Sequence, residues 1–130
     1  MIVADASAVI EALLGTSAGR AVTQQLFKAG ETVHAPHLID LEVAHVIRRY
    51  VAIGDIDEAR GRAAIRNMVD IQIRRYPHDV LLHRVWELRG NLSAYDAVYV
   101  ALAETLDAPL LTRDRRLADA ARRFARCQVV

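Results

Sequence analysis

The sequence predicts an α/β sandwich around a mainly parallel sheet, and three observations support this. Short apolar runs of the strand type alternate along the chain with segments of helical periodicity. Most connections between the predicted strands contain two helical segments, so the fold should be rich in helix with short strands. The 130 residues, 53% of them hydrophobic, suffice for one buried core, so we expect residues 1–130 to form a single domain.

Five short segments have the composition of strands. The first, Ile2 to Ala4, runs directly into Asp5, and the second is stopped by Pro36. Apolar and polar residues alternate in the third, which favours a short strand at the edge of the sheet. The predicted strands are residues 2–4, 32–36, 71–77, 109–112 and 127–130.

The segments between these strands carry apolar residues at helical spacing. Four of them end at a glycine, namely Gly15, Gly30, Gly54 and Gly90. Three begin after a residue suited to cap a helix, namely Asp57, Asp79 and Ser93. The predicted helices are residues 8–14, 19–29, 37–53, 58–69, 80–89, 94–106 and 115–125.

Composition excludes several classes of protein. The start of the chain lacks the basic and long apolar regions of a signal peptide, and no apolar run approaches the ~18 residues of a membrane-spanning helix. A single cysteine, Cys127, excludes an internal disulfide framework and a multi-cysteine zinc site. We therefore expect a soluble, cytoplasmic protein that does not enter a membrane.

Two aspartates follow predicted strands. Asp5 comes immediately after the strand at residues 2–4, and Asp114 lies two residues after the strand at 109–112. In a mainly parallel sheet, ligands bind in the crevice at the carboxyl ends of the strands, so both carboxylates are placed to share that crevice. Each aspartate taken alone is explained as well by capping the helix that follows it.

Glu42 and Asp96 lie on the apolar side of predicted helices. Glu42 has apolar neighbours such as Leu38 and Val46 one turn away, and Asp96 is followed one turn later by Tyr99. Acidic side chains are almost never buried without a partner. An ion pair with an arginine from another segment would also explain Glu42, and a place in the first helical turn would explain Asp96.

Together the four acids predict a metal site. Inward-facing carboxylates without matching cations repel one another, and a divalent cation removes that repulsion. Oxygen ligands without thiolates or a histidine cluster favour Mg²⁺ or Mn²⁺ over zinc. Without these four charges the chain carries a formal net charge of +5, against +1 for the whole, and a basic body around an acidic pocket suits a polyanion such as nucleic acid.

The four acids lie in the segments MIVADASA, PHLIDLEVAHVIRR, YDAVYVALA and LLTRDRRLADA. In this order and over the whole chain, the segments resemble PIN-domain ribonucleases and, more narrowly, the VapC toxins of bacterial toxin–antitoxin pairs. The resemblance implies a PIN-like three-layer sandwich with helices on both faces of a short-stranded sheet. It also implies an endoribonuclease that depends on Mg²⁺ or Mn²⁺, acts on RNA and is blocked by a VapB-like antitoxin.

The resemblance assigns roles to individual residues. The family's acids correspond to Asp5, Glu42, Asp96 and Asp114, and its small hydroxyls near the pocket to Ser7 and Thr112. The three aspartates would hold one ion directly and Glu42 directly or through water, and the ion would activate a water for attack on phosphorus. The departure from the family pattern is Ala4, where a bulkier β-branched residue is common.

Other residues are weaker candidates. Arg113, Arg115 and Arg116 flank Asp114 and are predicted to contact phosphates, although a solvated surface explains them too. Trp86 is expected to pack inside the protein rather than to stack on a base. The apolar stretches 80–86 and 101–106 are candidates for the face of a homodimer, although core packing explains them equally well.

Rival functions explain less of the pattern. A haloacid-dehalogenase-type phosphatase also has an aspartate after its first strand, but it needs a second aspartate where Ser7 stands and a catalytic lysine. A response-regulator receiver meets the same difficulty, because Lys28 is the only lysine and lies in an early helix. A non-catalytic PIN scaffold that binds only an antitoxin remains as an alternative, and the presence of all four acids argues against it.

Overall fold

A computed structural model describes residues 1–130 and contains a five-stranded sheet in the order β3-β2-β1-β4-β5. Every pairing between neighbouring strands is parallel, so the sheet is parallel throughout. The strand predicted to lie at an edge, β3, does so. The strands are β1 (Ile2–Ala4), β2 (Val33–Pro36), β3 (Ile73–Tyr76), β4 (Leu110–Thr112) and β5 (Cys127–Val129).

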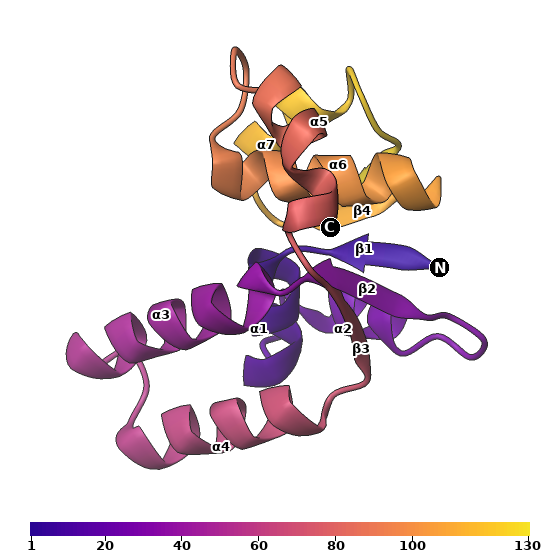
Figure 1. Ribbon diagram of the computed structural model, residues 1–130. Helices are drawn as coiled ribbons and strands as arrows, with labels where there is room; N and C mark the ends of the chain where they lie inside the picture. The colour runs from indigo at the N-terminus through magenta and orange to yellow at the C-terminus, as the bar shows by residue number, and fades with distance from the viewer.

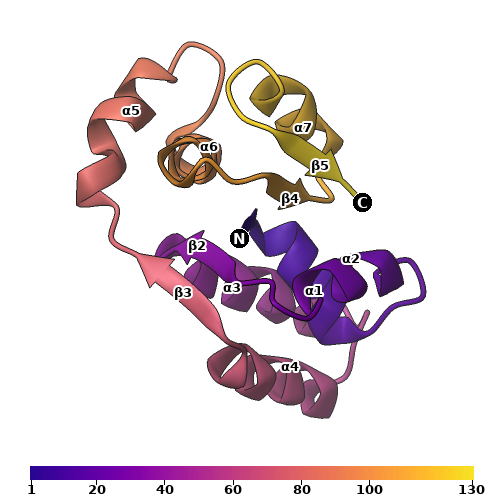
Figure 2. The same cartoon turned by 90° about the vertical axis from the view of Figure 1, so that its right-hand side faces the viewer.

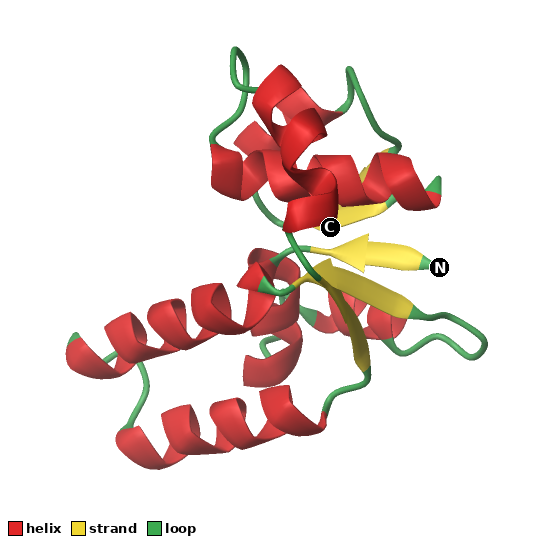
Figure 3. Cartoon of the chain, viewed as in Figure 1, coloured by secondary structure: helices red, strands yellow, loops and turns green.

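Helices cover both faces of the sheet, which confirms the predicted sandwich (Figures 1 and 3). Three of the four connections between consecutive strands contain more than one helix, and the last contains α7 alone. The helices are α1 (Ala6–Leu14), α2 (Arg20–Leu26), α3 (Leu38–Ala52), α4 (Glu58–Asp70), the 3₁₀ turn η1 (Asp79–Leu81), α5 (Leu82–Glu87), α6 (Ala94–Leu106) and α7 (Arg115–Ala121).

The helices divide into two groups (Figures 1 and 2). The group α1 to α4 lies on one side of the sheet and the group α5 to α7 on the other. Connections between parallel strands are right-handed, so those that run from β1 toward β3 and those that run back toward β5 must use opposite faces. The direction reverses between the neighbours β1 and β4, and such a switch point opens a crevice at the carboxyl ends of its strands.

Side-chain caps begin four of the helices. The side chains of Asp5, Asp57, Ser93 and Asp114 each accept a hydrogen bond from a backbone N–H in the first turn of the following helix. The predicted caps at Asp57 and Ser93 are therefore confirmed, and helix α1 begins two residues earlier than expected, directly after Asp5.

The predicted cap at Asp79 is wrong, because Asp79 lies inside η1 and makes no capping bond. The predicted helix 80–89 is divided into this 3₁₀ turn and the shorter helix α5. A 3₁₀ turn rotates successive side chains by about 120°, and here it buries Leu81 while Val80 and Leu82 stay exposed.

The two helices at residues 19–29 and 115–125 end earlier than predicted, at Leu26 and Ala121. Helical periodicity identifies the buried face but not the residue at which packing stops. After Leu26 the side chain of Phe27 already points into solvent.

The first half of the stretch 101–106 belongs to the core. In α6 the residues from Ala97 to Ala103 are all buried, and the helix packs on β1, β2 and β4. The buried residues Ala101 to Ala103 therefore leave only the end of this stretch, where Thr105 is exposed, for the predicted homodimer face. Trp86 was expected to be packed, yet its side chain is 66% exposed, with the Arg89 guanidinium 4.5 Å from its ring centroid. No helix combines the length and the hydropathy that crossing a bilayer requires.

Candidate active site

The four predicted acids lie at the carboxyl end of the sheet. Asp5 follows β1 and Asp114 follows β4, the two neighbouring strands of the switch point. Glu42 lies in the second turn of α3, which continues from β2, and Asp96 lies in the first turn of α6. The fold thus brings to one edge four side chains that are separated by as many as 109 positions in the chain.

Asp5 is held on both of its carboxylate oxygens. It is 5% exposed. Its Oδ1 accepts from the Ser7 hydroxyl at 2.7 Å and from the Ala8 N–H at 3.0 Å, and its Oδ2 accepts from the Thr112 hydroxyl at 2.6 Å. The two predicted supporting residues therefore contact the first acid directly. They fix the orientation of Asp5 from both α1 and β4.

Ser7 and Thr112 also organise the segment after β4. The backbone N–H of Arg113 donates to Ser7 Oγ at 2.8 Å, and that of Asp114 donates to Thr112 Oγ1 at 3.0 Å. Asp114 in turn caps α7, because its Oδ1 accepts from the N–H groups of Arg116 and Leu117. Capping and membership of the acid cluster are thus compatible for both Asp5 and Asp114.

The acids act on one another electrostatically. Burial raises the pKa of the Asp5 carboxyl, and the charge of Asp114 raises it further. The hydrogen bonds that Asp5 accepts lower this pKa in part. Burial also raises the pKa of Glu42, and the negative charges of Asp5 and Asp96 raise it further. For Asp96, burial and the charge of Asp114 raise the pKa. The site therefore holds negative charge at close range.

No basic side chain neutralises this charge through an ion pair. Other half-buried acids of the protein have arginine partners: Asp40 pairs with Arg75 at 2.9 Å and Glu104 with Arg84 at 2.7 Å. None of the four site acids takes part in a salt bridge. An arginine partner for Glu42, the alternative open from the sequence, is therefore wrong.

The donor set fits a hard divalent cation, because it offers only carboxylate and hydroxyl oxygens and lacks a counter-charge. The side chains do not form a finished ligand cage, since no three His, Cys, Asp or Glu side chains are arranged to hold one ion. Glu42, Asp96 and Asp114 are only partly buried, so a cation can reach their carboxylates from solvent.

The three predicted arginines differ in their positions. The Arg113 side chain lies against α1, with Nη1 3.3 Å from the Ala18 carbonyl oxygen and Nε 3.9 Å from Glu11. Arg115 is exposed. Arg116 lies beside Asp96, where its charge lowers the pKa of that carboxyl, and both line a cavity of about 210 Å³. Of the three arginines, Arg116 is thus the one that shares a cavity with a site acid.

Tyr99 is a site residue that the sequence reasoning missed. It is 2% exposed, and its hydroxyl donates a 2.6 Å hydrogen bond to Glu42 Oε1. Burial, the bond to Glu42 and the surrounding carboxylates raise the pKa of Tyr99. Its spacing places Tyr99 on the apolar side of the helix, and its position one turn after Asp96 is the signal in the sequence that it lies near the site.

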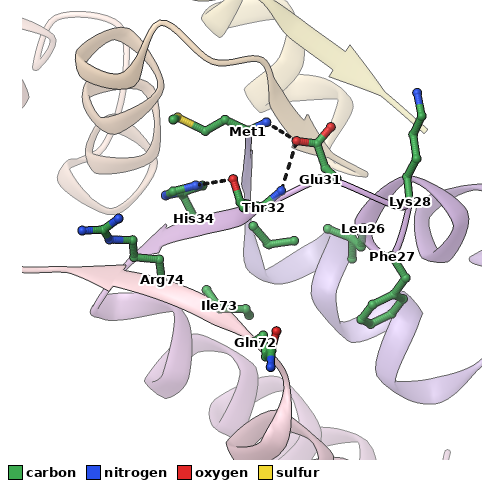
Figure 4. A pocket seen from close by; sticks show the side chains of 11 residues that line it. Met1, Leu26, Phe27, Lys28, Glu31, Thr32, His34, Gln72, Ile73 and Arg74 are labelled. Atoms are coloured by element: carbon green, nitrogen blue, oxygen red, sulfur yellow. Dashed lines mark hydrogen bonds and ion pairs between the residues drawn. The ribbon is translucent and has the colours of Figure 1, made fainter.

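A cavity of about 720 Å³ lies at the opposite, amino-terminal end of the strands (Figure 4). None of the predicted site residues lines it. The Met1 amino group is paired with Glu31, while the side chains of Lys28 and Arg74 point away from each other. The other polar groups of the cavity also bond one another, as Thr32 does with Glu31 and His34, so the acid cluster, whose members form no salt bridge, remains the candidate site.

Comparisons with known proteins agree with this geometry. The family model described as the PIN domain matches residues 2–123. The chain is 47% identical over 119 residues to ribonuclease VapC1 of Mycobacterium tuberculosis. The matched region covers 91% of this chain and 89% of that protein.

Solved structures share the fold. VapC20 of Mycobacterium tuberculosis, described as a toxin that cleaves the sarcin–ricin loop, has a TM-score of 0.69 at 16% identity over 92% of this chain and 95% of its own. VapBC2 of Rickettsia felis, bound to a DNA fragment from its promoter, has a TM-score of 0.69 at 11% identity, covering 99% of this chain and 98% of its own.

Proposed function

The chain belongs to the PIN-domain family, and from this membership we propose that it is a VapC-type endoribonuclease, the toxin of a toxin–antitoxin pair. The observation that carries the proposal is the cluster of four carboxylates at the switch point of the sheet, none of which has a cationic partner. Such a cluster is suited to phosphodiester hydrolysis assisted by a divalent cation.

We assign the cation site to Asp5, Asp96 and Asp114, with Glu42 as a further ligand either directly or through water. Mg²⁺, with Mn²⁺ as a substitute, suits these oxygen donors. The chemistry that such an ion supplies is activation of a water and stabilisation of the charge that develops on the phosphate.

The chain's own residues prepare this chemistry. Ser7 and Thr112 fix the orientation of the Asp5 carboxylate. Arg116, beside Asp96 and the cavity of about 210 Å³, is placed to contact a phosphate of the RNA backbone. Arg115 is a further candidate for such a contact, whereas the Arg113 side chain is bonded to the Ala18 carbonyl oxygen and lies near Glu11 of α1.

We propose two protein partners. The first is a VapB-like antitoxin, supported by the family and by the VapBC complex of similar fold. The second is another copy of this chain, bound through the face formed by Val80, Leu82, Trp86 and Tyr95, whose side chains are exposed and apolar. Because RNA is the proposed substrate, we place the activity in the cytoplasm.

Cleavage of a mixed RNA substrate tests the proposal. We expect activity with Mg²⁺ or Mn²⁺, none with EDTA, and a decrease of at least ~100-fold in Asp5→Asn, because the variant loses a charge on which transition-state stabilisation depends. Asp70→Asn, an exposed acid outside the cluster, is the matched control and should retain activity. Equal activity of wild type and Asp5→Asn, or activity that survives EDTA, would contradict the assignment. A wild type that binds antitoxin but cleaves nothing would favour the non-catalytic scaffold.

A further inference from the structure

One hydrogen bond links the two helices that carry Glu42 and Asp96. The Tyr99 hydroxyl on α6 donates to Glu42 Oε1 on α3 at 2.6 Å. Tyr99 lies three residues after Asp96, so both side chains project from the same side of α6. The bond therefore ties the acid of α3 to the helix that positions the acid of α6.

We propose that Tyr99 is a positioning residue that holds one oxygen of Glu42 and leaves the other oxygen for the cation or for a water bound to it. Oε1 has the tyrosine as its partner, and Oε2 accepts no hydrogen bond from the protein. The inference rests on the proposed function, because it assigns Glu42 to the cation site.

The kind of partner matters for this role. Half-buried acids elsewhere in the protein are paired with arginine, as in Asp40–Arg75 and Glu104–Arg84, and an arginine both orients and neutralises a carboxylate. A tyrosine hydroxyl orients the carboxylate without cancelling its charge. Glu42 therefore keeps the negative charge that attracts a divalent cation.

The alternative is that Tyr99 has only a structural role, since a buried hydroxyl requires a hydrogen-bond partner in any protein. The structural role and the positioning role predict different effects of Tyr99→Phe. This substitution keeps the ring and removes only the donor. If Tyr99 merely fills the core, stability changes and metal affinity does not. If it positions Glu42, Mn²⁺ affinity falls, because partners that orient ligands typically contribute about 10–100-fold.

We therefore expect Tyr99→Phe to weaken Mn²⁺ binding by about tenfold, measured by titration in the absence of RNA. Tyr76→Phe is the matched control, since it removes a hydroxyl that lies 2.7 Å from His34 Nδ1 and outside the acid cluster. Its Mn²⁺ affinity should equal that of the wild type. Thermal melting of both variants without metal measures the structural contribution separately.

A double-mutant cycle with Glu42→Ala gives the decisive measurement. With the carboxylate absent, Tyr99→Phe should have no further effect on Mn²⁺ affinity, so the two losses should not add. Additive losses, or an unchanged affinity in Tyr99→Phe, would overturn the inference. RNA cleavage by the wild type is measured alongside: if it is absent while the two residues remain coupled in Mn²⁺ binding, the proposed nuclease function fails and the positioning role stands.

Discussion

At the scale of single residues, the acid cluster that serves the proposed function lowers the stability of the folded protein. Asp5, Glu42 and Asp96 lose hydration and form no salt bridge, and burial raises the pKa of each. Hydrogen bonds from Ser7, Thr112 and Tyr99 offset part of this cost. The metal-free protein should therefore be limited in stability by its own site.

Glu42→Gln should stabilise the metal-free protein at neutral pH. The folded-state pKa of Glu42 lies above its ordinary value of 4.5, chiefly through burial, so the folded protein binds this proton more tightly than the unfolded chain does. The resulting stability is present below pH 4.5 and is lost as the pH rises through the folded pKa. Glutamine carries no charge and avoids that loss.

Urea denaturation in EDTA at pH 4.5 and pH 7.5 measures this difference. The stability of Glu42→Gln relative to the wild type should increase from the lower to the higher pH. Glu58→Gln is the control, because this acid lies exposed on α4 with Arg62 as its partner. A Glu42→Gln protein that is less stable than the wild type at pH 7.5 would show that the carboxylate is not strained.

At the scale of elements, the antiparallel helices α3 and α4 approach closely at Gly61. A Cβ at this position would lie 2.6 Å from Val51 Cγ2 and 3.6 Å from Ile47 Cγ2. The contact supports α3, the helix that carries Glu42. The glycine thus serves helix packing rather than an unusual backbone conformation.

Gly61→Ala should destabilise the protein by about 1–3 kcal/mol, since overpacking forces the two helices apart. Helix propensity alone predicts the opposite sign, a gain of about 1 kcal/mol. Denaturation midpoints decide between them. Gly90→Ala, where a Cβ meets no atom within 4 Å, should change stability by less than about 0.5 kcal/mol. A Gly61→Ala variant as stable as the wild type would mean that α3 and α4 separate at no cost.

At the scale of the whole molecule, apolar side chains remain exposed around η1, α5 and the start of α6. Leu82 and Tyr95 line a nearly apolar cavity of about 250 Å³ together with Leu38, and Trp86 lies one turn beyond Leu82 on α5. An exposed apolar face of this kind suits a twofold contact between identical chains, and an aromatic anchor typically dominates such contacts.

Combining Leu82→Glu with Trp86→Glu should convert a dimer into a monomer, with the dissociation constant rising roughly tenfold or more. Light scattering during size-exclusion chromatography measures the mass of each species. Ile53→Glu changes a side chain of similar exposure, 64%, at the far end of α3 and should remain dimeric. A monomeric wild type, or a dimeric double variant, would remove this face from consideration.

Much of the fold was predictable because it depends on local signals. Apolar runs located all five strands, and the side-chain caps at Asp57 and Ser93 located two helix starts. The wrong predictions concern segments whose local pattern is compatible with more than one structure. The segment after Asp79 forms a 3₁₀ turn, and Trp86 looked like core but lies on the surface.

The sequence by itself determined the composition of the site: four acids at strand ends or on apolar helix faces, with small hydroxyls beside the first and the last. Only the tertiary structure decided how they relate, because strand order, crossover handedness and helix orientation are set by contacts between distant segments. The reversal between β1 and β4 places Asp5 and Asp114 on neighbouring strands. The packing of α3 near α6 brings the Tyr99 hydroxyl to Glu42, a pairing across 57 positions that no local periodicity encodes.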